Sequence, residues 1–407
     1  MVPNGWIQAT LGDLVHKSAF GPRFTSELYS KEGAIGTIRT TDLYNDGEIN
    51  YATIPYADLD VSEYEEHVLN EGDLLITRSG TCGIPCIFTE QEKPIIAGAF
   101  LIRFQLNERV NSKFLHEVLK SAPVQSSIKR MAAGGVQKNL TGTSLKKLHL
   151  ALPPLPEQRK IAQILSTWDR GIATTEKLID ASKQQKKALM QQLLTGKKRL
   201  VDPETGKVFE GEWEEVKLKQ IGKCITGLTY SPNDVVDEGT LVLRSSNIQG
   251  GKLSFLDNVY VSSHIKEESK TRVGDILICV RNGSRNLIGK SAYITDKASG
   301  QAHGAFMTVF RGKYAEFVFQ LFQTVQFHRQ VNKNLGATIN SINTSDLHKF
   351  KFDFPKDKNE IEKIASVLTA ADKDIELLEA KLAHLKQEKK ALMQQLLTGK
   401  RRVSLSS

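Results

Sequence analysis

Two stretches of the chain carry apolar residues at alternating steps of four and three positions. In the first, from 161 to 193, the stepped positions hold Ile, Leu, Trp, Ile, Thr, Ile, Ser, Lys, Leu and Leu. In the second, from 364 to 396, nine of the ten stepped positions are apolar. This period of 3.5 residues is typical of a coiled-coil seam. It predicts two long helices whose narrow apolar faces need a partner, and the nearest candidate is the other helix of the same chain.

Start and stop signals bound both predicted helices. The segment 153–157, PPLPE, places prolines and then an acid where the first helix begins. The segments 195–199, TGKKR, and 398–402, TGKRR, place a glycine just past each helix and cations beside its negative end. We expect each helix to have roughly 38 residues and a length on the order of 55 Å, at the α-helical rise per residue.

These helices belong to a tandem duplication. The sequence KKALMQQLLTGK occupies 186–197 and recurs without change at 389–400, which is 203 residues later. Weaker matches precede it in the same order: IRTTDL at 38–43 and LRSSNI at 243–248, GDLLI at 72–76 and GDILI at 274–278, and GAF at 98–100 and 304–306. If a pseudo-two-fold axis relates the halves, the helices pair antiparallel and the globular parts lie at opposite ends of a rod.

Two features of the predicted seam qualify this arrangement. Lys186 and Lys389 occupy equivalent seam positions, which indicates a hydrated stretch there. The leucines beyond them are candidates for contact with another protein subunit, and they are Leu189, Leu193, Leu392 and Leu396.

The regions outside the helices have a mixed α/β pattern. Short β-rich runs at 74–77 and 276–280 follow Gly-Asp turns, whereas 114–120 and 317–326 have the pattern of short helices. We therefore predict an α+β fold with internal pseudo-two-fold duplication, in which two long antiparallel coiled-coil helices join two globular domains. The expected division is a first domain at 1–152, a first helix region at 153–199, a second domain at 200–354, a second helix region at 355–402 and a tail at 403–407.

Polar loops at equivalent places in the two halves are the candidate binding residues. They are rich in arginine, asparagine, serine and threonine, which hydrogen-bond base edges and phosphates. The candidates for DNA contact are Arg39, Thr40, Thr41, Arg78, Ser79, Thr81, Gln137, Lys138, Asn139, Arg244, Ser245, Asn247, Arg281, Asn282, Ser284, Arg285, Asn334 and Thr338.

Composition narrows the function classes. The chain has 407 residues, of which 40% are apolar and 25% charged, as in globular proteins with two or three domains. Its net charge of +9 favours a polyanionic partner. The four cysteines are too sparse for a disulfide framework, and the pair Cys82 and Cys86 lacks a second pair at metal-ligand spacing. The first residues lack the pattern of a signal peptide and no long apolar run is present, so we expect a cytoplasmic protein.

Motifs for catalysis are missing. The segment GSRNLIGKS at 283–291 is similar to a phosphate-binding loop, but it has five residues between the glycines where that loop needs four. The sequence contains neither a dinucleotide fingerprint, nor a paired-histidine metal motif, nor a nucleophile elbow. We therefore expect a chain without catalytic activity, cofactor or metal of its own.

The chain resembles the specificity subunits of type I restriction–modification systems over nearly its full length. The resemblance rests on the first-domain motifs LGDL at 11–14 and GDLLITRSGT at 72–81, on the junction LPPLPEQRKIA at 152–162, and on the duplicated helix end LLTGKKR at 193–199. The second junction, FPKDKNEI at 354–361, departs from the pattern because it keeps one proline and carries an inserted residue.

This resemblance implies a DNA-binding subunit with two target-recognition domains. Each domain would read one half of a bipartite, asymmetric site in double-stranded DNA, and the helices would fix the gap between the halves. Two modification subunits, which use S-adenosylmethionine, would bind this scaffold, and two restriction subunits, which use ATP and magnesium, could join them. A coiled-coil adaptor protein without DNA readout is the alternative.

Overall fold

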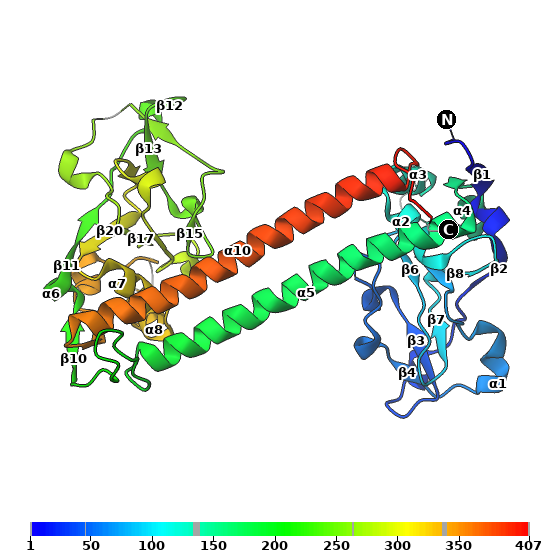
Figure 1. The fold of residues 1–407 in the computed structure, drawn as a ribbon, viewed down its shortest axis with the longest axis horizontal. Coiled ribbons are helices and arrows are strands. Elements are labelled where there is room, and N and C mark those ends of the chain that lie inside the picture. Colours follow the sequence, from blue (N-terminus) through cyan, green and yellow to red (C-terminus); the bar gives the residue numbers. More distant parts are fainter. Residues whose placement is uncertain (1, 45, 133–138, 263, 336–339, 406–407) are drawn as a thin grey trace. The chain divides into compact units, whose positions relative to one another are not determined.

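The computed structural model describes residues 2–44, 46–132, 139–262, 264–335 and 340–405 (Figure 1). The chain divides into two compact units. Unit 1 comprises Met1–Glu176 and Lys381–Ser407, and unit 2 comprises Lys177–Ala380. Each unit therefore contains one globular region together with a segment of each long helix.

The two long helices begin and end at equivalent residues of the duplication. Helix α5 spans Leu155–Leu193 and helix α10 spans Lys358–Leu396, and each has 39 residues. Gly196 and Gly399 follow them with φ angles of 67° and 66°, the left-handed conformation that ends a helix. The predicted helices and their stop signals are confirmed, and the altered second junction does not displace the start of α10.

In unit 1 the segments of α5 and α10 run antiparallel (Figure 1). Lys389 pairs with Asp169 at 2.6 Å, and Lys386 pairs with Glu176 at 2.7 Å. The later residue on α5, Glu176, pairs with the earlier residue on α10, Lys386, so the two segments run in opposite directions.

Unit 2 repeats this pairing with the roles of the helices exchanged. Lys186 pairs with Asp372 at 2.6 Å, and Lys183 pairs with Glu379 at 2.8 Å. Each of these residues lies 203 positions from its counterpart in unit 1. The predicted antiparallel pairing and the internal duplication are thus confirmed within both units.

The globular region of unit 1 is built on small sheets, antiparallel except for the parallel pair β3 and β7. The largest has the strand order β2-β8-β5-β6, a second has the order β4-β3-β7, and β1 pairs with β9. Four helices, α1 to α4, accompany them. The bounds are β1 (Ile7–Thr10), β2 (Val15–Phe20), β3 (Ile35–Ile38), β4 (Tyr56–Ala57), β5 (Leu74–Thr77), β6 (Pro85–Ile87), β7 (Ile95–Ala97), β8 (Leu101–Leu106), β9 (His149–Leu152), α1 (Val61–Tyr64), α2 (Ser112–Lys120), α3 (Ala122–Met131) and α4 (Gly142–Lys146).

The globular region of unit 2 has corresponding sheets. The order β11-β20-β17-β18 matches that of the largest sheet of unit 1, and β13 pairs in parallel with β19 as β3 does with β7. The bounds are β10 (Trp213–Lys217), β11 (Gly222–Thr226), β12 (Val235–Val236), β13 (Thr240–Leu243), β14 (Ile248–Gln249), β15 (Lys252–Leu253), β16 (Tyr260–Val261), β17 (Ile276–Cys279), β18 (Ser291–Tyr293), β19 (Ala302–His303), β20 (Met307–Gly312), β21 (Lys351–Pro355), α6 (Leu218–Ile221), α7 (Ala315–Phe322), α8 (Val325–Asn334) and α9 (Thr344–Leu347).

Both seam lysines form ion pairs, and Lys389 is buried whereas Lys186 is half-buried, so the hydrated stretch stays a prediction. Lys389 is only 8% exposed, and besides Asp169 it contacts the carboxylate of Glu117 at 3.3 Å. In unit 2 the amide of Gln320, which lies 203 residues after Glu117, donates instead to Asp372 at 2.9 Å. The duplication therefore keeps the lysine and its helix partner but replaces a second acid by a neutral amide.

Two of the seam leucines differ from expectation. Leu193 and Leu396 are 1% and 2% exposed and belong to the hydrophobic cores of units 2 and 1, respectively. Leu189 and Leu392 are partly buried against the same cores. Leu193 and Leu396 are thus interior side chains of their own units, which corrects their assignment to a surface for another subunit, whereas that assignment stays a prediction for Leu189 and Leu392.

Candidate nucleic-acid interface

Three polar segments that are far apart in the sequence meet in unit 1. The amide of Gly98 donates to the carbonyl of Ile38 at 2.8 Å, which brings the turn after β7 beside Arg39, Thr40 and Thr41. The amide of Arg78 donates to the carbonyl of Phe100 at 3.0 Å. Leu140 donates to the carbonyl of Arg78 at 2.9 Å, and Ser79 pairs with Asn139 in an isolated β-bridge.

Unit 2 brings the corresponding segments together. Gly304 donates to the carbonyl of Leu243 at 3.0 Å, and the amide of Arg281 donates to the carbonyl of Phe306 at 3.1 Å. The backbone of Asn282 bonds to Asn340 at 3.2 Å, and its side chain donates to the Ser245 hydroxyl at 3.1 Å. Both units therefore assemble one polar face from loops that the sequence analysis had identified separately.

Arg39 and Asp42 form the turn that follows β3. The guanidinium of Arg39 donates to both carboxylate oxygens of Asp42, at 2.9 and 3.0 Å, and to the carbonyl of Thr53 at 3.1 Å. Asp42 is 1% exposed, so it carries a buried charge that Arg39 compensates. The hydrogen bond to Asp42 raises the pKa of Arg39. Arg39 is exposed, but its guanidinium already pairs with Asp42 of the same turn.

In unit 2 this turn contains Asn247 in place of the acid. Asn247 is fully buried, and its amide donates to the carbonyls of Ser254 and Asp257 at 2.9 and 3.3 Å. Its side chain thus supports the turn from inside and is not presented to a ligand. The neighbouring Arg244 pairs with the Asp257 carboxylate at 2.9 Å.

Arg78 and Arg281 differ from these turn arginines in their surroundings. Among the ion pairs of the described residues, none involves Arg78 or Arg281. The Arg78 guanidinium carbon lies 4.4 Å from the Phe20 ring centroid, and its Nε donates to Asn139 at 3.3 Å. The Arg281 guanidinium carbon lies 5.8 Å from the ring centroid of Phe306. Both guanidinium groups therefore lie near an aromatic ring, and no ion pair of the described residues neutralises their charge.

The remaining candidates are placed as follows. Thr41, Thr81, Ser284 and Arg285 are exposed, and Thr40, Ser79, Ser245 and Asn282 are half-buried at the same loops. Asn334 is exposed at the end of α8, where its amide bonds back to the carbonyl of Gln330 at 2.8 Å. Gln137, Lys138 and Thr338 lie outside the described residues.

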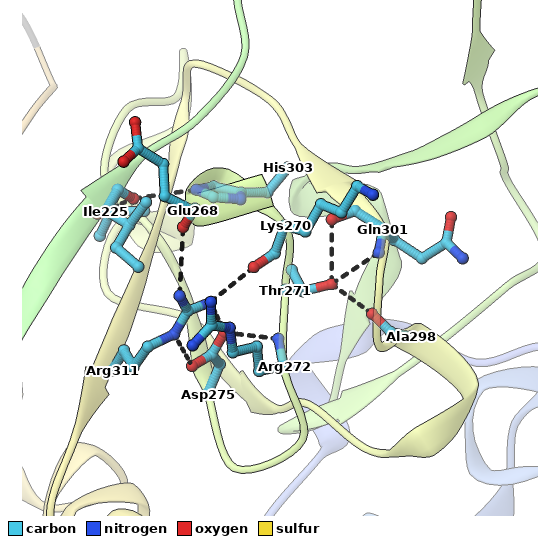
Figure 2. Close-up of polar contacts among 11 residues, drawn as sticks. Ile225, Glu268, Lys270, Thr271, Arg272, Asp275, Ala298, Gln301, His303 and Arg311 are labelled. Carbon is cyan, nitrogen blue, oxygen red and sulfur yellow. Dashed lines mark hydrogen bonds and ion pairs between the residues drawn. The ribbon is translucent and has the colours of Figure 1, made fainter. Parts of the chain in front are cut away.

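The duplicated Gly-Asp element supports the sheet beneath this face. Figure 2 shows Arg311 of β20 donating to Asp275 through two nitrogens, at 2.7 and 2.8 Å, and to the carbonyls of Glu268 and Lys270. The backbone of Arg272 donates to the same carboxylate at 2.7 Å. Asp275 therefore caps the turn before β17 and also pairs with an arginine of β20, the neighbouring strand in the sheet.

Unit 1 contains the same arrangement. Arg103 of β8 donates to Asp73 at 2.7 Å and to the carbonyl of Glu66 at 3.0 Å, and both charged side chains are 6% exposed. The Gly-Asp turn at the start of the motif that contributes to the family resemblance thus has a structural role.

Sequence reasoning missed three aromatic residues at the face. Phe20, Phe100 and Phe306 are 44%, 57% and 56% exposed. The available signal was the tripeptide Gly-Ala-Phe, which occurs in both halves but was used only as a marker of the duplication. Phe20 ends β2, and Gly21 after it packs so closely that a Cβ there would lie 2.0 Å from the Ala97 carbonyl.

Within the part of the chain that the structure describes, no group of three or more histidine, cysteine, aspartate or glutamate side chains is arranged to hold a metal ion. No helix within those residues combines the length and apolarity needed to cross a membrane.

Comparison with known proteins identifies the family. The family described as "Type I restriction modification DNA specificity domain" matches residues 3–183 and again 210–387. The MjaVIII specificity subunit of a type I restriction enzyme from Methanocaldococcus jannaschii is 28% identical over 353 residues, which cover 83% of this chain and 81% of that protein. The family match extends across both globular regions and most of each long helix.

Solved structures share the fold. The S subunit of a type I restriction-modification system from M. genitalium aligns with a TM-score of 0.62 at 16% identity, covering 100% of this chain and 99% of that one. A chain from a study of complex assembly and conformational transition of the type I R-M system aligns with a TM-score of 0.57 at 17% identity, covering 98% and 100%. With two family matches that together span most of its length, this chain belongs to the type I restriction modification DNA specificity family.

Proposed function

We propose that this chain is the non-catalytic DNA-specificity subunit of a type I restriction–modification complex. Each globular region reads one half of a bipartite, asymmetric site in double-stranded DNA, and the paired helices set the gap between the halves and carry the partner subunits. The globular regions, 1–152 and 200–354, act as the two target-recognition domains.

The observation that carries this proposal is the duplicated polar face. In both units, loops from three places in the sequence are joined by backbone hydrogen bonds, and an unneutralised arginine lies among them. Side chains on the two faces differ, as in Thr40 and Thr41 against Ser245 and Ser246. Two related but different faces on one chain suit a target with two unlike halves.

The reacting chemistry in this proposal belongs to partner subunits. Two modification subunits bind S-adenosylmethionine and methylate adenine, and two restriction subunits, where present, bind ATP and magnesium. The chain itself contributes recognition and scaffolding, and we place it in the cytoplasm because its partner is DNA.

Mapping of methylated bases tests this function. The chain is co-expressed with the modification subunit encoded beside it in a methylation-deficient host, and N6-methyladenine is mapped across the genome. We expect a split motif with a fixed gap that disappears when this chain is omitted. A complex that forms but leaves no new methylation would contradict DNA readout and favour the adaptor alternative.

A further inference from the structure

Phe100 and Phe306 occupy the same position of the same turn in the two units. Leu101 donates to the carbonyl of Gly98 at 2.9 Å, and Met307 donates to that of Gly304 at 2.8 Å, so each Gly-Ala-Phe tripeptide forms a tight turn before a core strand. The rings are 57% and 56% exposed. A single exposed apolar side chain is ordinary, but two at matching positions of otherwise divergent regions call for a shared reason.

Each phenylalanine is fixed beside the arginine that lacks an acidic partner. The carbonyl of Phe100 accepts from the amide of Arg78 at 3.0 Å, and the carbonyl of Phe306 accepts from the amide of Arg281 at 3.1 Å. These bonds hold the turn and the arginine loop together in both units, and in unit 2 the guanidinium of Arg281 lies over the Phe306 ring. Within the described residues, neither ring belongs to a hydrophobic cluster of its unit.

We propose that Phe100 and Phe306 are DNA-contacting residues, each pressing its ring against apolar base atoms of its own half-site beside Arg78 or Arg281. This inference rests on the proposed function. A phenylalanine ring has no hydrogen-bonding group, so on DNA it contacts thymine methyl groups or the face of a base at an opened step. The adjacent arginine supplies the charge that phosphates or guanine edges require.

Equilibrium binding to a duplex that carries the mapped motif tests this role. The complex with the modification subunit is prepared with wild-type chain, Phe100→Ala, Phe306→Ala and the control Val325→Ala, a residue at the start of α8 that is 64% exposed. We expect each phenylalanine variant to lose roughly tenfold to a hundredfold in affinity, as for loss of an aromatic contact to a base. The slope of log Kd against log salt should stay unchanged, because no charge is removed.

Two further duplexes distinguish the forms of contact. In the first duplex, uracils replace the thymines. If the alanine variants then bind as tightly as the wild type, the rings contact thymine methyl groups. In the second duplex, fluorescence of 2-aminopurine that increases on binding of the wild type but not of the alanine variants indicates an opened base step. A 5-iodouracil duplex, cross-linked to the wild-type complex, should yield a peptide containing Phe100 or Phe306.

Wild-type affinity in both phenylalanine variants, with cross-links elsewhere, would overturn the inference. So would variants that lose the modification subunit while the chain stays folded, because the rings would then serve a protein interface. Since these assays start from a wild-type complex that binds its motif, their failure leaves the proposed function standing. A wild type without a motif would instead refute that function.

Discussion

Lys389 on α10 lies 2.6 Å from Asp169 on α5, and the same lysine is within 3.3 Å of Glu117 on α2. The equivalent Lys186 pairs with Asp372 at 2.6 Å, and there the neutral Gln320 donates to Asp372. Both lysines lie in the segment that is repeated without change. The unchanged sequence thus preserves an ion pair that fixes the register of the helices in each unit.

Replacing these lysines by methionine should have unequal effects. Lys389→Met leaves Glu117, whose side chain is 9% exposed, with Lys120 at 3.5 Å as its remaining cation, and should cost about 2 kcal/mol. Lys186→Met leaves only Asp372, whose side chain is 37% exposed, and should cost about 1 kcal/mol. Hydrogen exchange of unit 1 and unit 2 measures the two losses separately. Equal losses would contradict the assigned role of Glu117.

The buried pair of Arg103 and Asp73 should be sensitive to removal of one partner. Arg103→Leu leaves a buried carboxylate without its counter-ion and should destabilise unit 1 by about 3–5 kcal/mol. Burial already raises the pKa of Asp73, so its charge depends on this arginine. The double variant with Asp73→Asn should recover part of the loss, which hydrogen exchange can measure. A double variant less stable than Arg103→Leu would show that the pair is not the cause.

Substitution of Arg78 should weaken DNA binding, whereas substitution of Arg39 should lower the stability of unit 1. Arg78→Ala removes a charge without an acidic partner and should weaken DNA binding while reducing the salt slope by about one. Arg39→Ala leaves the buried carboxylate of Asp42 unpaired and should destabilise unit 1 by about 2–3 kcal/mol. Binding isotherms at several salt concentrations and thermal unfolding of both variants provide the comparison. A salt slope unaffected by Arg78→Ala would argue against a phosphate contact.

Unit 1 should lose stability in acid through His116. Burial lowers the pKa of His116 to about 4, with Lys120 and Lys389 acting in the same direction and Glu117 opposing them. The folded state therefore favours the neutral ring, and its contribution to stability is lost as pH falls from about 6.5 towards 4. Relative to His116→Gln, the wild type should lose about 3 kcal/mol over that interval. The two proteins should be compared by hydrogen exchange at pH 7 and pH 4.5, and parallel pH dependences would refute this assignment.

The helices were predictable because their seam and stop signals depend on local pattern. Gly196 and Gly399 end α5 and α10 as the sequence indicated, and the 203-residue repeat indicated that the two helices pair antiparallel. The ion pairs of the seam were not predictable, because the partners of Lys186 and Lys389 come from the opposite helix and, for Lys389, also from α2.

The polar loops were found as residue types, but their distinct roles depend on tertiary neighbours. Asn247 and Arg78 have similar polar character in the sequence, yet the first is buried under its turn and the second lies on an aromatic ring. Phe100 and Phe306 were missed because apolar side chains are expected in the core. Only the fold shows that the turn at Gly98 and Gly304 turns them outward.

Exchange of one globular region tests the central claim most directly. Residues 1–152 are replaced by the corresponding region of another member of the family, and N6-methyladenine is mapped in the host that carries the modification subunit. The account predicts that one half of the split motif changes, while the other half and the gap stay the same. A motif that is unchanged, or altered in both halves while the complex still assembles, would contradict the assignment of one half-site to each region.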